Sequence, residues 1–215
     1  MFDYPYLFFE VIAFLVAVFQ YNKIKHTPYV YFIPYLFFIV AYEIGTLYNC
    51  CSIAHSNLWI SNITMTISFL FYSVFLSNLI KSPKTKKWIK RLIVLSIFCS
   101  VLNTLFVQGF WKLDTITILL QFGIIILINC IYFYELMNFS QKQLVIIKLP
   151  EFWLNTGLLF FCLAKFLFFS AFAYMAYHNN YAYRFLFDVI ANLACAILYP
   201  CLTVSFLCIS KTNNQ

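Results

Sequence analysis

The residues best suited to chemistry in this sequence are ionisable side chains within otherwise apolar stretches. They occur at Glu10, Glu43, Glu135, Lys165 and Asp188. An ionisable group in hydrocarbon costs about 2.5–3.5 kcal/mol on insertion scales, so each of these groups needs a partner or water. Carboxylates and an ammonium group at such positions could bind a polar ligand or line a path for ions.

The expected depths of these residues predict a shared site. With the spans oriented as argued below, Glu10, Glu43 and Asp188 lie in the outer half of the membrane, and Lys165 lies near its middle. Asn192 follows Asp188 by four residues and therefore shares its helix face. We expect an outward-facing polar pocket whose ligand-binding residues are Glu10, Glu43, Lys165, Asp188 and Asn192. The alternative is that these residues form structural ion pairs, or that the acids nearest the surface are hydrated.

Membrane-spanning helices must position these groups, because the composition excludes an ordinary soluble domain. Of the 215 residues, 64% are hydrophobic and 10% are charged, and the mean hydropathy is +0.86. Soluble domains have about 45–50% apolar and about 25% charged residues. The apolar runs lack the alternation of barrel strands. Seven spans of about 20 residues fit this length only if the loops are short.

The sequence therefore predicts an all-α integral membrane protein, with residues 1–215 forming one bundle of seven transmembrane helices. Short polar or basic breaks separate the spans, so consecutive helices should be antiparallel neighbours. Pro200 predicts a kink in the last span. The predicted spans are 4–21, 29–48, 57–80, 88–107, 115–137, 150–177 and 183–209.

The positions of Lys and Arg predict the orientation. Eleven of the 14 Lys and Arg residues fall on one side of the predicted bundle, and positive residues near span ends stay on the cytoplasmic side. We therefore expect the N-terminus outside and the C-terminus in the cytoplasm, as in a bacterial cytoplasmic (inner) membrane protein. The first span lacks the features of a cleaved signal peptide, so we expect it to remain.

A basic cluster stands in the third predicted loop. Its position favours a topology signal that contacts anionic lipids at the cytoplasmic face, in preference to a nucleic-acid site. The residues assigned to this contact are Lys84, Lys86, Lys87, Lys90 and Arg91.

Other chemistries lack their sequence signals. No P-loop, dinucleotide fingerprint, His-Glu-x-x-His or Cys-x-x-Cys motif is present, so we expect no enzyme, no cofactor and no metal site. Retinal proteins carry a Lys in the middle of the seventh helix, and the span 183–209 contains none. Cys50 and Cys51 are expected outside as free thiols, with a strained neighbouring disulfide or a bridge between protomers as alternatives.

Two stretches carry a resemblance to a family. They are AYEIGTLYN, from Ala41 to Asn49, and PEFWLNTG, from Pro150 to Gly157. Both resemble segments of small uncharacterised seven-helix inner-membrane proteins of Bacteroidota-type bacteria. Genes of that family are often neighbours of histidine kinases and response regulators. The resemblance implies a sensory or regulatory role beside a signalling partner, and it transfers no catalytic residue.

Three classes of function follow. The first is a receptor-like or sensory membrane protein that passes a signal to a partner. The second is a small transporter or channel that uses the intramembrane charges, and the third is a structural subunit of a membrane complex. A conduit needs polar lining on both sides of the membrane midplane, whereas a receptor can have a dry inner half. Polar residues of the predicted inner half are few, which favours the receptor; they are chiefly Ser68, Ser73, Asn78, Asn129 and Thr203.

Overall fold

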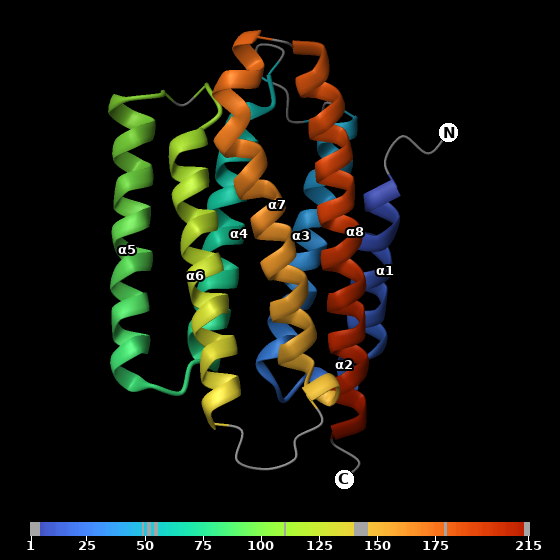
Figure 1. The fold of residues 1–215 in the computed structure, drawn as a ribbon. Coiled ribbons are helices and arrows are strands. Elements are labelled where there is room, and N and C mark those ends of the chain that lie inside the picture. Colours follow the sequence, from blue (N-terminus) through green and yellow to red (C-terminus); the bar gives the residue numbers. More distant parts are fainter. Residues whose placement is uncertain are drawn as a thin grey trace. The chain divides into compact units, whose positions relative to one another are not determined.

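All the regular elements in the described part of the chain are helices. The computed structural model describes residues 5–48, 50, 53, 56–109, 111–139, 146–178 and 180–212, and within these it describes only the backbone of residues 5, 172–178, 180–184, 187, 188 and 210–212. The elements, shown in Figure 1, are α1 (Pro5–Phe19), α2 (Tyr21–Ile24), η1 (Pro28–Tyr31), α3 (Phe32–Leu47), α4 (Leu58–Leu79), α5 (Pro83–Phe106), α6 (Thr115–Phe139), η2 (Ile146–Lys148), α7 (Pro150–His178) and α8 (Asn180–Thr212).

The chain is an α-helical integral membrane protein. Among the described residues, six segments are long and apolar enough to cross a bilayer: Pro28–Leu47, Leu58–Leu79, Pro83–Phe106, Thr115–Asn138, Pro150–Ala171 and Val189–Ile209. The apolar stretch of α1, Tyr6–Phe19, is shorter. At about 1.5 Å per residue α1 spans roughly 22 Å, against a hydrocarbon core of about 30 Å. The seventh crossing and the orientation stay predictions.

The start of α5 corrects the fourth predicted span. The helix begins at Pro83 and not at Trp88, because the hydroxyl of Ser82 accepts a hydrogen bond from the Thr85 N–H (3.4 Å) and proline suits the first helical position. Residues assigned above to a loop are therefore helical, namely Lys84, Lys86, Lys87, Lys90 and Arg91. The last helix also extends beyond its predicted span at both ends, since α8 runs from Asn180 to Thr212.

The helices divide into two compact units. The first unit comprises Met1–Ala41 and Ser140–Gln215, and the second comprises Tyr42–Phe139. The first unit therefore contains α1, α7 and α8 with the greater part of α3, and the second contains α4, α5 and α6 with the end of α3.

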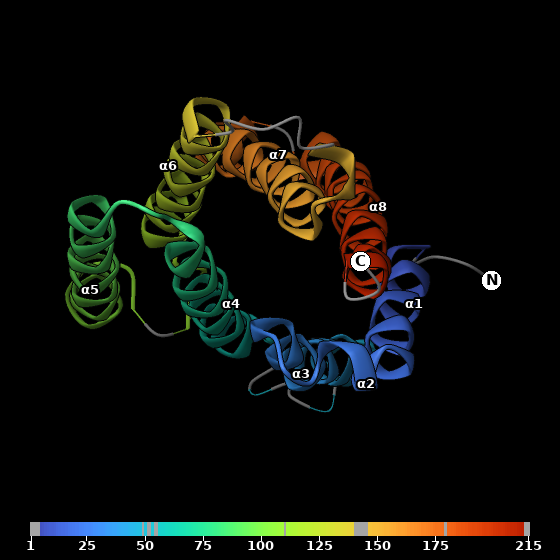
Figure 2. The ribbon, with the colours of Figure 1, turned by 90° about the horizontal axis from the view of Figure 1, so that it is seen from below.

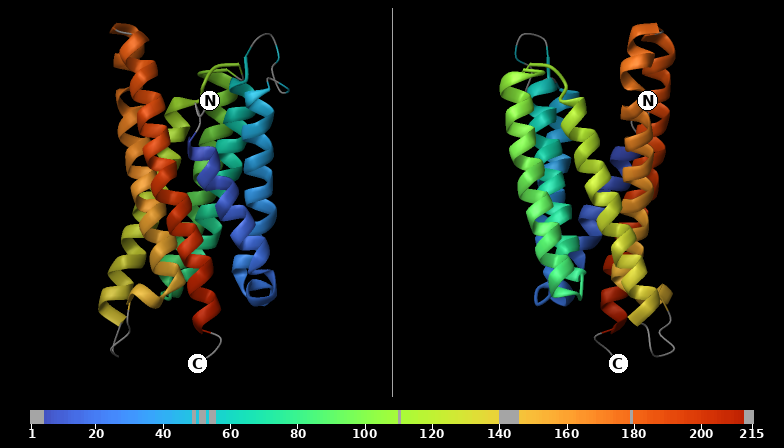
Figure 3. Two further views of the ribbon diagram at one scale, coloured as in Figure 1. Left: turned by 90° about the vertical axis from the view of Figure 1, so that its right-hand side faces the viewer. Right: turned by 60° about the vertical axis from the view of Figure 1, so that its left-hand side comes forward.

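The core of the first unit is the close packing of α7 against α8, which run antiparallel and side by side in Figure 3. Gly157 makes this approach possible, because a Cβ atom there would lie 2.6 Å from Cys201 Cβ. The start of α7, at Pro150 as predicted, is tied to α8 where the Ser205 hydroxyl donates to the Pro150 carbonyl oxygen (2.8 Å). The helix α8 continues through Pro200.

Aromatic rings join the start of α3 to the end of α8. Phe206 meets Tyr29 and Phe32 with ring centroids 6.3 and 5.7 Å apart, and all three side chains are buried. On α1, which packs against α8, Ala13 and Ala17 are fully buried. The last part of α8 is thus held by α7, by α3 and by the small side chains of α1.

In the second unit α4, α5 and α6 pack against one another, as the view in Figure 2 also shows. The side of α5 that faces into this unit is a stripe repeating every three or four residues, as one face of a helix requires. It comprises the buried residues Ile89, Ile93, Ser96, Ser100 and Asn103. Gly109 has φ +81° in the turn that follows, a conformation that favours glycine.

Candidate functional site

Among the predicted site residues of the first unit whose side chains the structure describes, Glu10 is the most deeply buried. Its side chain is 0% exposed, and its carboxylate oxygen Oε1 accepts a hydrogen bond from the Tyr199 hydroxyl on α8 (2.8 Å). The two residues are 189 positions apart in sequence. Tyr199 is a site residue that the sequence prediction missed, although it lies two helical turns after Asn192 on the same face of α8.

Lys165 is also buried in the first unit. Its side chain is 7% exposed, and its ammonium lies 5.8 Å from the centroid of the Phe161 ring, within the range of a cation–π interaction. It belongs to the buried stripe of α7, together with Leu158, Cys162 and Phe169. The structure therefore places a cation in the interior of this unit.

The register of α7 against α8 determines which residues of α8 lie at the same level as Lys165. Gly157 lies beside Leu198 and Cys201, and eight further residues advance α7 by about 12 Å. In an antiparallel pair this brings Lys165 approximately level with Asn192. Helical side chains lean toward their own N-terminus, so Lys165 and Tyr199 lean toward a common level from opposite directions. Glu10, Tyr199, Lys165 and Asn192 therefore fall within about two turns of α8 in height, and these four residues are called the first-unit polar group below. The contact shown among them is the hydrogen bond from Tyr199 to Glu10.

The two remaining predicted site residues are Asp188 and Glu43. Asp188 lies in α8 one turn before Asn192, and its side chain is outside the described residues. Glu43 lies on α3 in the second unit and is half-buried; its carbonyl oxygen accepts a hydrogen bond from the Thr46 hydroxyl (2.8 Å). The predicted set is thus divided between the two units.

A second buried acid, Asp114, was missed by the sequence prediction. It is 4% exposed and directly precedes α6. Its carboxylate accepts hydrogen bonds from the Asn103 amide, from the Thr104 hydroxyl (3.2 Å) and from the Thr117 N–H (3.4 Å). The last bond is a helix N-cap, so an acid just before the apolar run that starts at Thr115 was the signal available in the sequence.

Asn62 completes the network around Asp114. Its side-chain amide donates to the Lys112 carbonyl oxygen (2.8 Å), and its Oδ1 accepts from the Asp114 N–H (3.0 Å). Gln108 bridges Asn103 and Thr115 through bonds of 2.8 and 3.0 Å. Each residue of this network forms a hydrogen bond to another part of the unit. The network therefore connects α4, α5 and α6, and it is called the Asp114 clasp below.

Polar residues continue from the Asp114 clasp along the contact of α5 with α6, and then they stop. The bond from Asn103 to Asp114 sets an antiparallel register, in which Ser100 and Ser96 fall near the levels of Thr117 and Gln121. Beyond them come Ile93 and Ile89 of α5 and Ile125 and Ile128 of α6, all buried. In this α5–α6 seam, the half nearer the α5–α6 connection is polar. The other half is lined by isoleucines as far as Glu135, and it is called the dry half below.

At the dry end of the seam, Glu135 holds the α4–α5 connection. It is buried, and its two carboxylate oxygens accept hydrogen bonds from the N–H groups of Lys81 (2.7 Å) and Ser82 (3.3 Å). These backbone bonds assign Glu135 a structural role.

Several polar residues of the predicted inner half are engaged by their own helices. The Ser73 hydroxyl donates to the Leu70 carbonyl oxygen (3.3 Å), the Asn129 amide to that of Ile125 (2.9 Å), and the Thr203 hydroxyl to that of Tyr199 (2.9 Å). Such bonds to the preceding turn satisfy a hydroxyl or amide within the helix itself. These three donors are therefore satisfied within their own helices.

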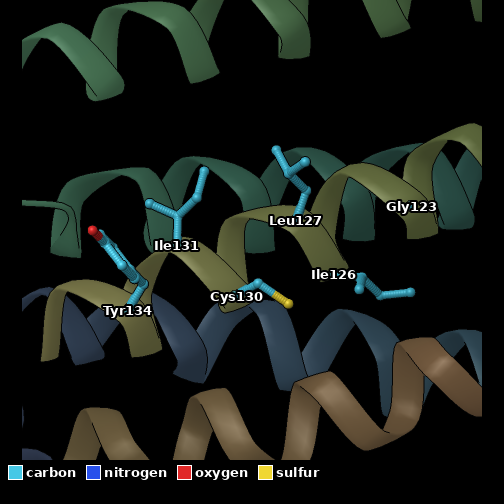
Figure 4. Close-up of a pocket in the computed structure, with 6 residues that line it drawn as sticks. All are labelled: Gly123, Ile126, Leu127, Cys130, Ile131 and Tyr134. Carbon is cyan, nitrogen blue, oxygen red and sulfur yellow. The ribbon is translucent and has the colours of Figure 1, made fainter. Parts of the chain in front are cut away.

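An open apolar hollow of about 480 Å³ lies on α6. The residues that line it, labelled in Figure 4, extend along about three turns of that helix. They are Gly123, Ile126, Leu127, Cys130, Ile131 and Tyr134. None is a predicted site residue, and the lining has little polar chemistry beyond one thiol and one phenol.

Within the described residues, no three of His, Cys, Asp and Glu are grouped as a metal ion would require. Cys50 is a free, exposed thiol, and Cys51 lies outside the described residues. No protein-family model, curated protein or solved structure matches this chain.

Proposed function

We propose that this chain is a receptor-like sensory membrane protein that recognises a polar ligand through the first-unit polar group and passes a signal to a partner protein. The observation that carries the proposal is the buried hydrogen bond from Tyr199 to Glu10, with Lys165 buried in the same unit. A carboxylate, a phenol, an ammonium and an amide together offer both donors and acceptors to a ligand.

The dry half of the α5–α6 seam favours a receptor over a conduit. A path for ions or solutes needs polar lining along its whole length, whereas the seam turns from Ser96 and Gln121 to isoleucines. In the proposed topology the N-terminus is outside, α1 is the first of seven crossings, and the dry half is cytoplasmic. The membrane is proposed to be a bacterial cytoplasmic membrane with anionic lipids at its inner face.

The proposal is tested by ligand-induced stabilisation of the purified protein. Amino acids, organic acids, amines and nucleosides are screened for compounds that raise the Tm, since a ligand at about 100 times its Kd stabilises by about 2.7 kcal/mol. We expect Glu10→Gln to abolish the rise, because the amide oxygen still accepts from Tyr199 while the negative charge is lost. Thr203 lies one helical turn after Tyr199 in α8. Thr203→Val is therefore the matched control, and the ligand should still raise the Tm of this variant.

Two results would contradict the proposal. One is a screen without any compound whose stabilisation depends on Glu10. The other is uptake of the same compound by proteoliposomes in a manner that Lys165→Met removes, which would make the protein a transporter.

A further inference from the structure

The exposed face of α5 changes from basic to apolar along its length. Opposite the buried stripe that begins at Ile89, residues at helical spacing form a second stripe. It starts with the exposed cations Lys84, Lys87 and Arg91. It continues with exposed apolar side chains, which are Val94, Leu95, Phe98, Leu102 and Leu105. This set of eight residues is called the α5 outer stripe below.

The charge and the length of the α5 outer stripe match those of a phospholipid in one leaflet of a bilayer. From Arg91 to Leu102 the helix rises by about 16 Å, which matches one leaflet of a hydrocarbon core of about 30 Å. Trp88 is 49% exposed beside the cations, where an indole ring favours the interface between headgroups and hydrocarbon. The cations would therefore stand at headgroup level while the apolar side chains lie along an acyl chain.

In the described residues of α4 and α6, one acid lies at this end of α5. Glu135 is the acid that reaches it, and both of its oxygens are engaged by the N–H groups of Lys81 and Ser82. The same bonds fix the start of α5, which Ser82 also caps. The basic end of the α5 outer stripe is thus held in place and keeps its positive charge.

We propose that the α5 outer stripe is a binding site for an anionic phospholipid, whose phosphate headgroup is held by Lys84, Lys87 and Arg91 and whose acyl chain lies against Val94, Phe98 and Leu102. This goes beyond the proposed function, because it involves neither the polar ligand nor a signalling partner. The proposed site also differs from a general electrostatic attraction between the membrane and all lysines on the predicted cytoplasmic side. Binding at the proposed site depends on which face of α5 carries the charge.

The chain provides a matched control for that difference. Lys86 and Lys90 lie on the same turns of α5 but are rotated about 60–100° from Ile89, which places them beside the buried stripe. Lys87→Gln with Arg91→Gln, and Lys86→Gln with Lys90→Gln, each remove two positive charges. The first pair changes the α5 outer stripe and the second does not.

The experiment measures lipid binding to detergent-purified full-length protein by native mass spectrometry, with phosphatidylglycerol and phosphatidylcholine of identical acyl chains as probes. We expect wild type to retain phosphatidylglycerol in preference to phosphatidylcholine. Lys87→Gln/Arg91→Gln should weaken phosphatidylglycerol binding about tenfold or more, and Lys86→Gln/Lys90→Gln should leave it within about twofold.

Fluorescence provides a second measurement that does not depend on charge removal. Phosphatidylglycerol with brominated acyl chains should quench wild-type tryptophan emission more than it quenches Trp88→Phe, because Trp88 borders the α5 outer stripe. Equal losses in the two charge variants would show a general electrostatic attraction and overturn the site. Equal retention of the two lipids by wild type, or quenching that is unchanged in Trp88→Phe, would also overturn it.

Discussion

Glu10 and Asp114 are both buried acids, yet their surroundings assign them different roles. The carboxylate of Asp114 accepts bonds from Asn103, Thr104 and Thr117, all close in sequence. Glu10 instead meets Tyr199 from the far end of the chain. A carboxylate engaged by local donors can hold a helix end, whereas one that joins two distant helices responds to any change in their separation.

Replacing Asp114 by Ala should destabilise the second unit. The change removes the cap of α6 and the acceptor of one Asn103 N–H, while the Thr104 hydroxyl keeps the Ser100 carbonyl oxygen as its acceptor. We expect a cost of about 2–4 kcal/mol in unfolding free energy. Unfolding in mixed micelles with increasing sodium dodecyl sulfate measures this loss. Thr104→Val removes only one donor and should cost about 1 kcal/mol. An unchanged midpoint for Asp114→Ala would show that the Asp114 clasp contributes nothing to stability.

At the scale of the helices, close approach of α7 and α8 depends on one residue without a side chain. The Cβ that alanine would add at position 157 meets Cys201 Cβ at 2.6 Å and the Leu198 carbonyl oxygen at 3.3 Å. The Cβ atom of Cys201 and the carbonyl oxygen of Leu198 are both fixed by the backbone of α8. Neither can move aside as the end of a flexible side chain could. The two helices would have to separate, which would also strain the bond between Ser205 and Pro150.

Gly157→Ala should therefore destabilise the protein by about 1–3 kcal/mol, because overpacking outweighs the helix propensity that alanine gains. The same unfolding titration measures it. In the background of Cys201→Gly, which removes the opposing Cβ, the Gly157→Ala change should become neutral or stabilising. If its cost is the same in both backgrounds, the contact between the two helices does not limit their approach.

For the whole molecule, the membrane topology depends on whether α1 crosses the bilayer. In the described part of the chain, six segments are long enough to cross the bilayer, and α1 is apolar but about 8 Å short of an average hydrocarbon core. A short span can be accommodated by local thinning of the bilayer at modest cost. The predicted crossing of α1 would place the two ends of the chain on opposite sides of the membrane, which only an odd number of crossings allows.

Epitope tags at the two ends test this topology. We expect an N-terminal tag to be accessible to antibody in cells with an intact cytoplasmic membrane, and a C-terminal tag only after permeabilisation. A membrane-impermeant maleimide should also label a Cys50-only variant in intact cells, because that thiol is exposed and the connection after α3 is expected outside. Tags on the same side would show six crossings, with α1 lying at the surface.

The sequence by itself determined the class of protein, most helix positions and the residues whose burial would matter, because length, hydropathy and charge act locally along a chain. It drew attention to Glu10 and Lys165, which are buried, and it placed the start of α7 at Pro150. It assigned the cations of α5 to a loop because charge outweighed the capping signal of Ser82 in that interpretation.

Only the tertiary structure showed which of these groups meet. Tyr199 reads in the sequence as one of many aromatic residues, and its role depends on the packing of α1 against α8. Asp114 reads as a loop acid until Asn62, from another helix, is bonded to its backbone. The physical reason is that a hydrogen bond between distant segments depends on the register and rotation of two helices, which neither segment specifies alone.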